Sequence, residues 1–423
     1  MAAAAGPEQV RVEQLHSLGG SQDIPSMERF RMHVMRAADV LSLERLRPHE
    51  ELKAQGLVRP YDPATMGHVF FVSHQWTSFT DPDHTGLQLR TLQSLIRRML
   101  DGRMPPVSVH LGDILAGVRS RTVSSELFRR MAQNAVIWLD YISVPQLGGD
   151  GRYSSRRAAG HAPSSDFLDA VVSIPAYVGR SSAFFVLCPP VQHRELSALP
   201  NGVQHGSFCD FVAWHRRGWC RLEALALIAQ TRQSIPAIIC AGPHATPYMF
   251  PRQTWLPPCQ GEFTCCKMGH RAPQGTGVAE LAIPCDKGLV VDVTKTLLRH
   301  RLAYHRRRGE EDMRRIWSAF SPYFLRGMPR ERSVGAPWDD AEATDKDAVC
   351  SPAGVGMPGI FAADAEGEDP ARRYWGDSAA LNLRTALIWC PEEQPVQLGW
   401  PALPAPPAAP ALAGPVPALA LPL

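Results

Sequence analysis

The chain has 423 residues, a formal net charge of +3 and 45% hydrophobic residues, enough for a core of roughly 200–250 residues. The small net charge argues against a nucleic-acid partner, because no strong field draws a polyanion to the surface. No apolar stretch is long and proline-free enough to span a membrane, and no signal peptide is predicted. We therefore expect a cytoplasmic protein with reduced cysteines.

The two ends of the chain are predicted to be disordered. Residues 1–24 are polar and irregular, and residues 328–423 are rich in Gly, Pro, Asp and Ala. A helical lead-in is predicted over residues 25–64, because apolar side chains recur there at three- and four-residue spacing. These side chains are Met27, Phe30, Val34, Ala38 and Leu41. The remaining residues, 65–327, are predicted to form the folded domain.

Short, continuous apolar runs within 65–327 predict strands that are buried on both faces. The five runs cover residues 68–73, 136–141, 183–188, 235–240 and 289–293. Helical patterns separate the runs. They comprise 89–100, a helix that begins at Ser124 or Ser125, one that begins at Ser164 or Ser165 and that Pro175 kinks or ends, about 217–230, and a long helix through Leu297 and Phe320. This alternation predicts an α/β fold, a parallel sheet with helices on both faces.

In an open parallel sheet, ligands bind beyond the carboxyl ends of the strands. The residues that follow the first two strands should therefore share one rim with the start of the 217–230 helix. The candidates at this rim are Ser73, His74, Trp76, Asp140, Arg216, Arg217, Trp219 and Glu223. From position alone, Glu223 is better explained as a surface charge that complements the helix dipole. Core packing for Trp76, a bracing role for Asp140 and solvated side chains for the arginines are also open alternatives.

The order of these motifs resembles that of TIR domains. Val72-Ser73 ends the first strand, Leu139-Asp140 ends the second, and a Trp-Cys-x-x-Glu motif spans Trp219 to Glu223. The sequence also resembles HET (heterokaryon incompatibility) domains, in Ser73-His74-Gln75-Trp76 and in the segment from Trp138 to Gln146. It departs from them where Ser143-Val144-Pro145-Gln146 stands in place of Cys-Ile-Asn-Gln. The resemblance covers about residues 65–245 and implies a flavodoxin-like, TIR-like signalling domain.

In plant-type TIR domains the glutamate of that motif cleaves NAD, so the resemblance implies Glu223 as catalytic residue and NAD as a substrate rather than a cofactor. Loss of nicotinamide passes through an oxocarbenium-like transition state, which an anionic Glu223 would stabilise. Substrate-binding roles follow for Ser73, His74, Trp76, Asp140 and Trp219, and Arg216 or Arg217 would meet the pyrophosphate. The same fold also suits a non-enzymatic module that self-associates into a homo-oligomer or recruits a partner.

A second group combines thiols and one imidazole, the ligand types that zinc prefers. Its members are Cys259, Cys265, Cys266, His270 and Cys285. Their spacing matches none of the paired Cys-x-x-Cys patterns. Ordinary buried or loop thiols are therefore favoured over a zinc site, and no cofactor is predicted.

Overall fold

The computed structural model describes residues 8–9, 27–108, 121–146, 165–197, 208–230, 235–250, 256–267, 270 and 285–327. All of them belong to the first of two units into which the chain divides, Met1–Asp364 and Ala365–Leu423. The predicted disordered tail over 328–423 lies outside the described residues. Within the predicted disordered N-terminus, the strand β1 (Glu8–Gln9) is formed and pairs with β6. No helix among the described ranges combines the length and apolar character of a membrane span.

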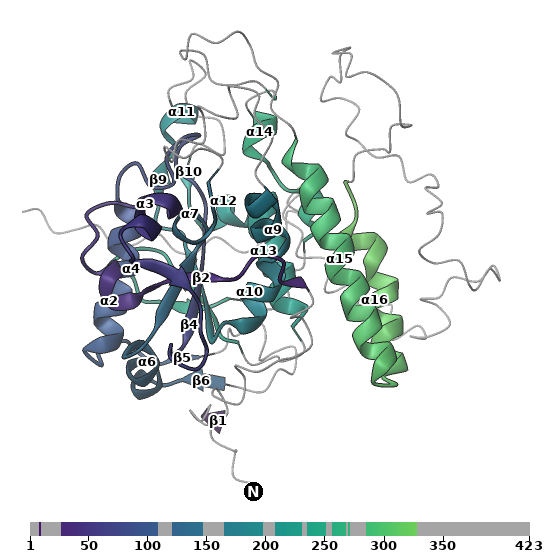
Figure 1. The fold of residues 1–423 in the computed structure, drawn as a ribbon, viewed down its shortest axis with the longest axis horizontal. Coiled ribbons are helices and arrows are strands. Elements are labelled where there is room, and N and C mark those ends of the chain that lie inside the picture. The colour runs from purple at the N-terminus through teal and green to yellow at the C-terminus, as the bar shows by residue number, and fades with distance from the viewer. Residues whose placement is uncertain are drawn as a thin grey trace, which may run out of the picture. The chain divides into compact units, whose positions relative to one another are not determined.

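Seven strands form one mixed sheet in the order β12-β11-β8-β4-β7-β2-β3 (Figure 1). The first four strand predictions are confirmed, and these four strands are mutually parallel at the centre of the sheet. They are β4 (Val69–His74), β7 (Val136–Leu139), β8 (Ala183–Leu187) and β11 (Ala237–Cys240). Numbered along the chain, they lie side by side in the order 2-1-3-4.

The prediction of a purely parallel sheet was wrong at both edges. β2 (His33–Arg36) runs antiparallel to β7 and to β3 (Val58–Pro60), and β12 (Tyr248–Met249) runs antiparallel to β11. β2 also replaces most of the predicted N-terminal helix, which was wrong. Helix in the lead-in is limited to α2 (Ala37–Val40) and α3 (His49–Ala54). The backbone of β7 offers a free edge there, and pairing with it outweighs a helical spacing of apolar residues.

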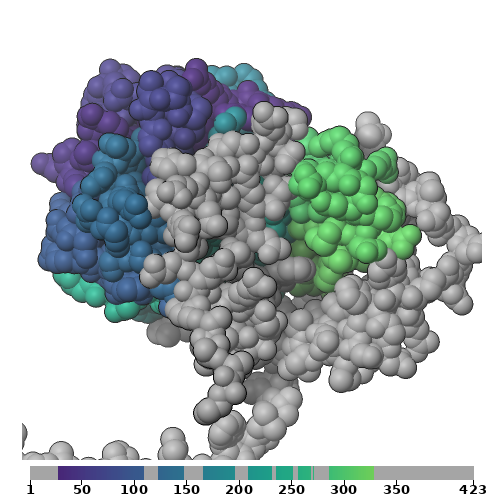
Figure 2. All heavy atoms as spheres, turned by 90° about the horizontal axis from the view of Figure 1, so that it is seen from below, coloured from purple at the N-terminus to yellow at the C-terminus, as the bar shows by residue number. Residues whose placement is uncertain are grey.

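The fifth predicted strand, 289–293, was also wrong, because these residues form part of helix α15 (Asp286–Arg307). Val290 and Val293 are fully buried. An apolar run of this length does not distinguish a buried strand from the buried end of a helix. α15 packs against α16 (Glu311–Phe324) and α13, and the pair α15–α16 is green in Figures 1 and 2.

Helices cover both faces of the sheet, as predicted. One face carries α4 (Leu87–Leu100) and α6 (Ser125–Ala132), and the other carries α9 (Ser165–Val172), α10 (Ile174–Arg180) and α13 (Gly218–Ile228). Ser124 caps α6, since its Oγ accepts the Leu127 N–H at 3.2 Å. α9 ends before Pro175, which lies in the first turn of α10. The remaining short elements are β5 (Val107–Ser108), β6 (Arg121–Val123), α7 (Asp140–Ser143), β9 (Val191–Gln192), α11 (Arg194–Ser197), β10 (Phe208–Cys209), α12 (Phe211–Arg216), η2 (Pro258–Gln260) and α14 (Thr264–Lys267).

Phe71 lies at the centre of one face of the sheet. Its ring stacks on Trp138, at 4.3 Å between centroids, and on Phe184, at 5.1 Å. Phe71→Ala is expected to lower the free energy of unfolding by about 3–5 kcal/mol, because it leaves a cavity between two fixed rings. Val212→Ala, at a side chain that is 55% exposed, is expected to change it by less than about 0.5 kcal/mol. Urea denaturation followed by circular dichroism measures both, and equal losses would contradict this packing.

Candidate active site

The structure brings five of the predicted site residues together at the carboxyl ends of two strands. Ser73 and His74 are the last residues of β4, and Trp76 follows them. Asp140 comes directly after β7 and opens α7. Glu223 reaches this edge from α13. The predicted rim is therefore present for these residues.

Glu223 is buried and hydrogen-bonded within the protein. Ser73 Oγ donates to Glu223 Oε2, and Trp214 Nε1 donates to Ser73 Oγ at 2.9 Å. Only 8% of the surface of Glu223 is exposed, so the alternative of a solvated surface charge is wrong. Burial raises the pKa of Glu223 to about 8, although the hydrogen bond from Ser73 acts in the opposite direction. Glu223 is therefore mainly protonated at neutral pH, and burial outweighs the helix dipole that we expected to favour the anion.

His74 forms an ion pair with Asp140. His74 Nε2 lies 2.6 Å from Asp140 Oδ1, and Nδ1 lies 2.5 Å from Gln88 Oε1. The amide of Gln88 is oriented by its Nε2, which donates to the Gln75 carbonyl at 2.7 Å. Because both ring nitrogens face oxygen acceptors, His74 has to carry two protons and a positive charge.

The pKa values agree with this assignment. Burial lowers the pKa of His74, but the charge of Asp140 and the hydrogen bonds to Asp140 and Gln88 outweigh burial and raise it to about 9. Burial raises the pKa of Asp140, but its contacts with His74 and Trp76 outweigh that effect and lower it overall. Trp76 Nε1 donates to Asp140 Oδ2 at 3.1 Å, and the Tyr141 N–H donates to Oδ1 at 2.6 Å. Asp140 therefore braces its loop, as one of the alternatives expected.

Solvent reaches this network at Asp140 rather than at Glu223. The Asp140 side chain is 35% exposed, whereas that of His74 is 1% exposed. Trp76 is half-buried and packs edge-on against Tyr141 at 5.6 Å between centroids. A polar ligand therefore meets Asp140 and Trp76 first, and it has to displace part of this cover to reach the Glu223 carboxyl.

Three predicted residues make other contacts, at the start of α13. Arg217 Nη2 donates to Thr264 Oγ1, and Trp219 Nε1 donates to Asp286 Oδ2 at 3.4 Å. The carbonyl oxygen of Arg216 accepts the Glu262 N–H at 2.8 Å. The side chains of Arg217 and Trp219 thus contact α14 and α15 instead of the Glu223 carboxyl.

Sequence reasoning missed three residues that hold the site. Gln88 fixes His74, Trp214 fixes Ser73, and Cys220 directs its Sγ to the His74 carbonyl oxygen at 3.7 Å. Gln88 lies in the first turn of the helix after β4, so the rule that points to strand ends could have been extended to it. For Trp214 no sequence signal exists, because the direction of its indole is set by tertiary packing.

No protein-family model matches the chain, and neither do curated proteins or solved structures. The geometry itself offers three ionisable groups whose pKa values are pushed apart by their surroundings, an arrangement that separates proton donors from acceptors. At neutral pH these are a protonated Glu223, a cationic His74 and an anionic Asp140.

The raised pKa of Glu223 predicts a pH-dependent stability. The folded protein holds this proton with a pKa of about 8, against an ordinary value of 4.5, so the free energy of unfolding should fall as pH rises between these values. The slope is at most about 1.4 kcal/mol per pH unit. Glu223→Gln keeps the shape but removes the titration, so its stability profile should be flatter from about pH 5 to 6.5, below the range in which His74 contributes. Parallel profiles in urea denaturation would show that Glu223 titrates normally.

The ion pair predicts the titration of His74. In Asp140→Asn, burial acts on the imidazole without a compensating charge, so the pKa of His74 should fall from about 9 to below its ordinary value of 6.5. Titration of the His74 ring signals by NMR measures this shift. Asp101→Asn, in an exposed turn, is the matched control and should leave the His74 signals unchanged. A His74 pKa that stays near 9 in Asp140→Asn would contradict the pairing.

Proposed function

We propose that residues 65–327 form a TIR/HET-like signalling domain with a flavodoxin-like core, and that it hydrolyses NAD at the rim formed by β4, β7 and α13. The 2-1-3-4 order of the parallel strands supports this fold, in which ligands bind at the point where strand order reverses. The contact between Ser73 and Glu223 carries the proposal. It joins the end of the Val-Ser strand to the glutamate of the Trp-Cys-x-x-Glu motif, 150 positions away.

The reaction breaks the bond between ribose C1′ and the nicotinamide nitrogen. The bonding electrons leave with nicotinamide, and water adds to C1′ with release of one proton. The nicotinamide ring of NAD is cationic, and a cation close to a carboxyl lowers its pKa. Bound substrate would therefore shift Glu223 toward the anion, which then stabilises the positive charge that develops on the ribose. Trp76, at the exposed side of the network, is placed to stack on a ring.

One observation favours the second candidate, a non-enzymatic module that self-associates or recruits a partner. The Glu223 carboxyl already has an internal partner in Ser73, and its exposed fraction is only 8%. Such a satisfied carboxyl suits a brace between α13 and the sheet as well as it suits a catalytic group.

NAD consumption by the full chain tests the proposal. Glu223→Gln should lower nicotinamide release by about 100-fold or more, because the neutral amide cannot stabilise the ribose cation. Glu126→Gln, which removes an exposed carboxylate on α6, should retain full activity. Release is measured with protein in solution and concentrated on beads, since the resemblance to TIR domains implies assembly.

Equal nicotinamide release by the wild type and Glu223→Gln would remove Glu223 from the reaction. No release by the wild type under either condition, together with concentration-dependent self-association in light scattering, would favour the non-enzymatic module. Circular dichroism of each variant shows whether a lost activity reflects a lost fold.

A further inference from the structure

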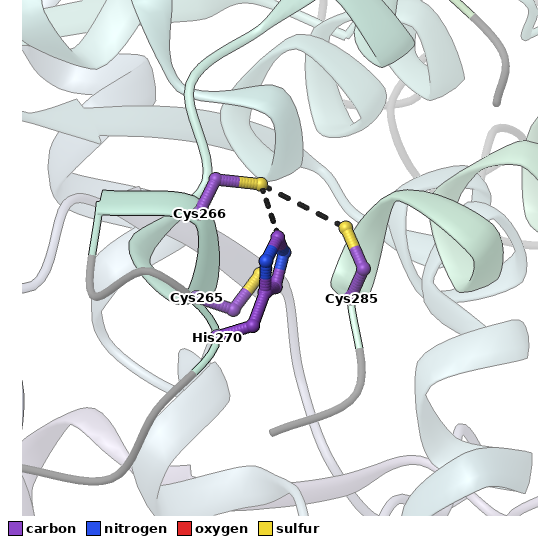
Figure 3. A group of neighbouring side chains, drawn as sticks. All are labelled: Cys265, Cys266, His270 and Cys285. Atoms are coloured by element: carbon purple, nitrogen blue, oxygen red, sulfur yellow. Dashed lines mark hydrogen bonds between the residues drawn. The ribbon is translucent and has the colours of Figure 1, made fainter. Parts of the chain in front are cut away.

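Four side chains converge at one point beside α13 (Figure 3). They are Cys265 and Cys266 of α14, His270, and Cys285 at the start of α15. One ligand atom of each, a sulfur or a ring nitrogen, lies within 4.8 Å of all the others. Cys259, which the sequence grouped with them, is fully buried nearby and lies outside this group.

The separations match those of a tetrahedral zinc site. Cys266 Sγ lies 3.7 Å from Cys285 Sγ and 3.5 Å from His270 Nε2. With Zn–S near 2.3 Å and Zn–N near 2.0–2.1 Å, tetrahedral geometry requires about 3.8 Å between two sulfurs and about 3.6 Å between sulfur and nitrogen. A disulfide would instead hold its two sulfurs at about 2.05 Å. The set of three thiols and one imidazole is also one of the usual structural zinc sets.

The backbone around the group is arranged to present these ligands. His270 has φ of 56°, a left-handed conformation that no other non-glycine residue among the described ranges adopts. This conformation costs about 1–2 kcal/mol, and it belongs to a turn in which the His270 N–H donates to the Cys265 carbonyl at 2.8 Å. The Asp286 N–H, at the start of α15, donates to Cys265 Sγ at 3.3 Å. Such backbone donors to sulfur stabilise thiolate ligands.

We propose that Cys265, Cys266, His270 and Cys285 bind one structural zinc ion, which anchors α14 and the start of α15 to α13. The surrounding packing gives the ion this role. Cys265 packs with Leu222 of α13 and Val290 of α15 in one buried cluster. This inference is independent of the proposed NAD hydrolysis.

The start of α13 depends on the same segment. The Gly218 N–H donates to the Glu262 carbonyl at 3.0 Å, and the ring of Phe263 lies over Gly218 so closely that a Cβ there would come within 2.1 Å of it. Zinc would therefore hold in place the loop on which the first turn of α13 rests, five positions before Glu223.

Metal analysis of the full chain, purified under reducing conditions with zinc in the medium, tests the proposal. We expect one zinc per chain. Replacement by Co²⁺ should give the visible absorption of tetrahedral cobalt with thiolate ligands. Cys285→Ser and His270→Ala should each weaken zinc binding by more than the roughly 10–100-fold that loss of a second-shell partner causes.

Two further variants keep the test independent of folding. Cys259→Ala removes a buried neighbouring thiol and should retain one zinc. His270→Cys supplies a fourth thiolate, so it should retain the metal and shift the cobalt spectrum. Absence of zinc and of a cobalt spectrum in the wild type, or equal loss of metal in Cys259→Ala and Cys285→Ser, would overturn the proposal.

Discussion

The carboxyl of Glu223 lies in the interior of the protein, where an ionisable group is stable only with a hydrogen-bond partner. Ser73 is that partner, and it is held in turn by the indole of Trp214. Three elements are therefore joined at one hydroxyl oxygen: the end of β4, α12 and α13. Because successive side chains of a strand point to opposite faces, the same strand end directs His74 toward α4, where Gln88 and Asp140 receive it. The pairing of Ser73 thus fixes both halves of the rim.

The distribution of protons keeps this rim electrically balanced. With Glu223 neutral, the positive His74 and the negative Asp140 compensate each other, so no isolated charge is buried. Ionisation of Glu223 would leave one net negative charge at the site. A cationic group bound near Glu223 restores the balance, which is why the site is better suited to a positively charged ring than to an anion.

Much of the fold could be predicted because β4, β7, β8 and β11 are buried on both faces and appear as continuous apolar runs. The same signal failed for the 289–293 run, whose valines are buried on a helix. It also failed for β2, where pairing with β7 decides the structure. At the site, the rule that points to strand ends located Ser73, His74 and Asp140. Sequence does not contain the burial of Glu223 or the direction of the Trp214 and Trp219 side chains, because these depend on how α12, α13 and α15 pack. The Cys and His residues around 265–285 are too irregularly spaced to reveal in sequence that they meet.

The antiparallel strands at the margins of the sheet have a consequence for how two copies of the domain can meet. Among the described residues, the outermost strands are β3, with three residues that end in Pro60, and β12, with two. Proline has no N–H to donate, and strands this short present few unpaired backbone groups, so neither margin is a template for a strand from another molecule. Any homo-oligomer of this domain has to form through helical or loop surfaces, and its sheet does not continue from one copy into the next.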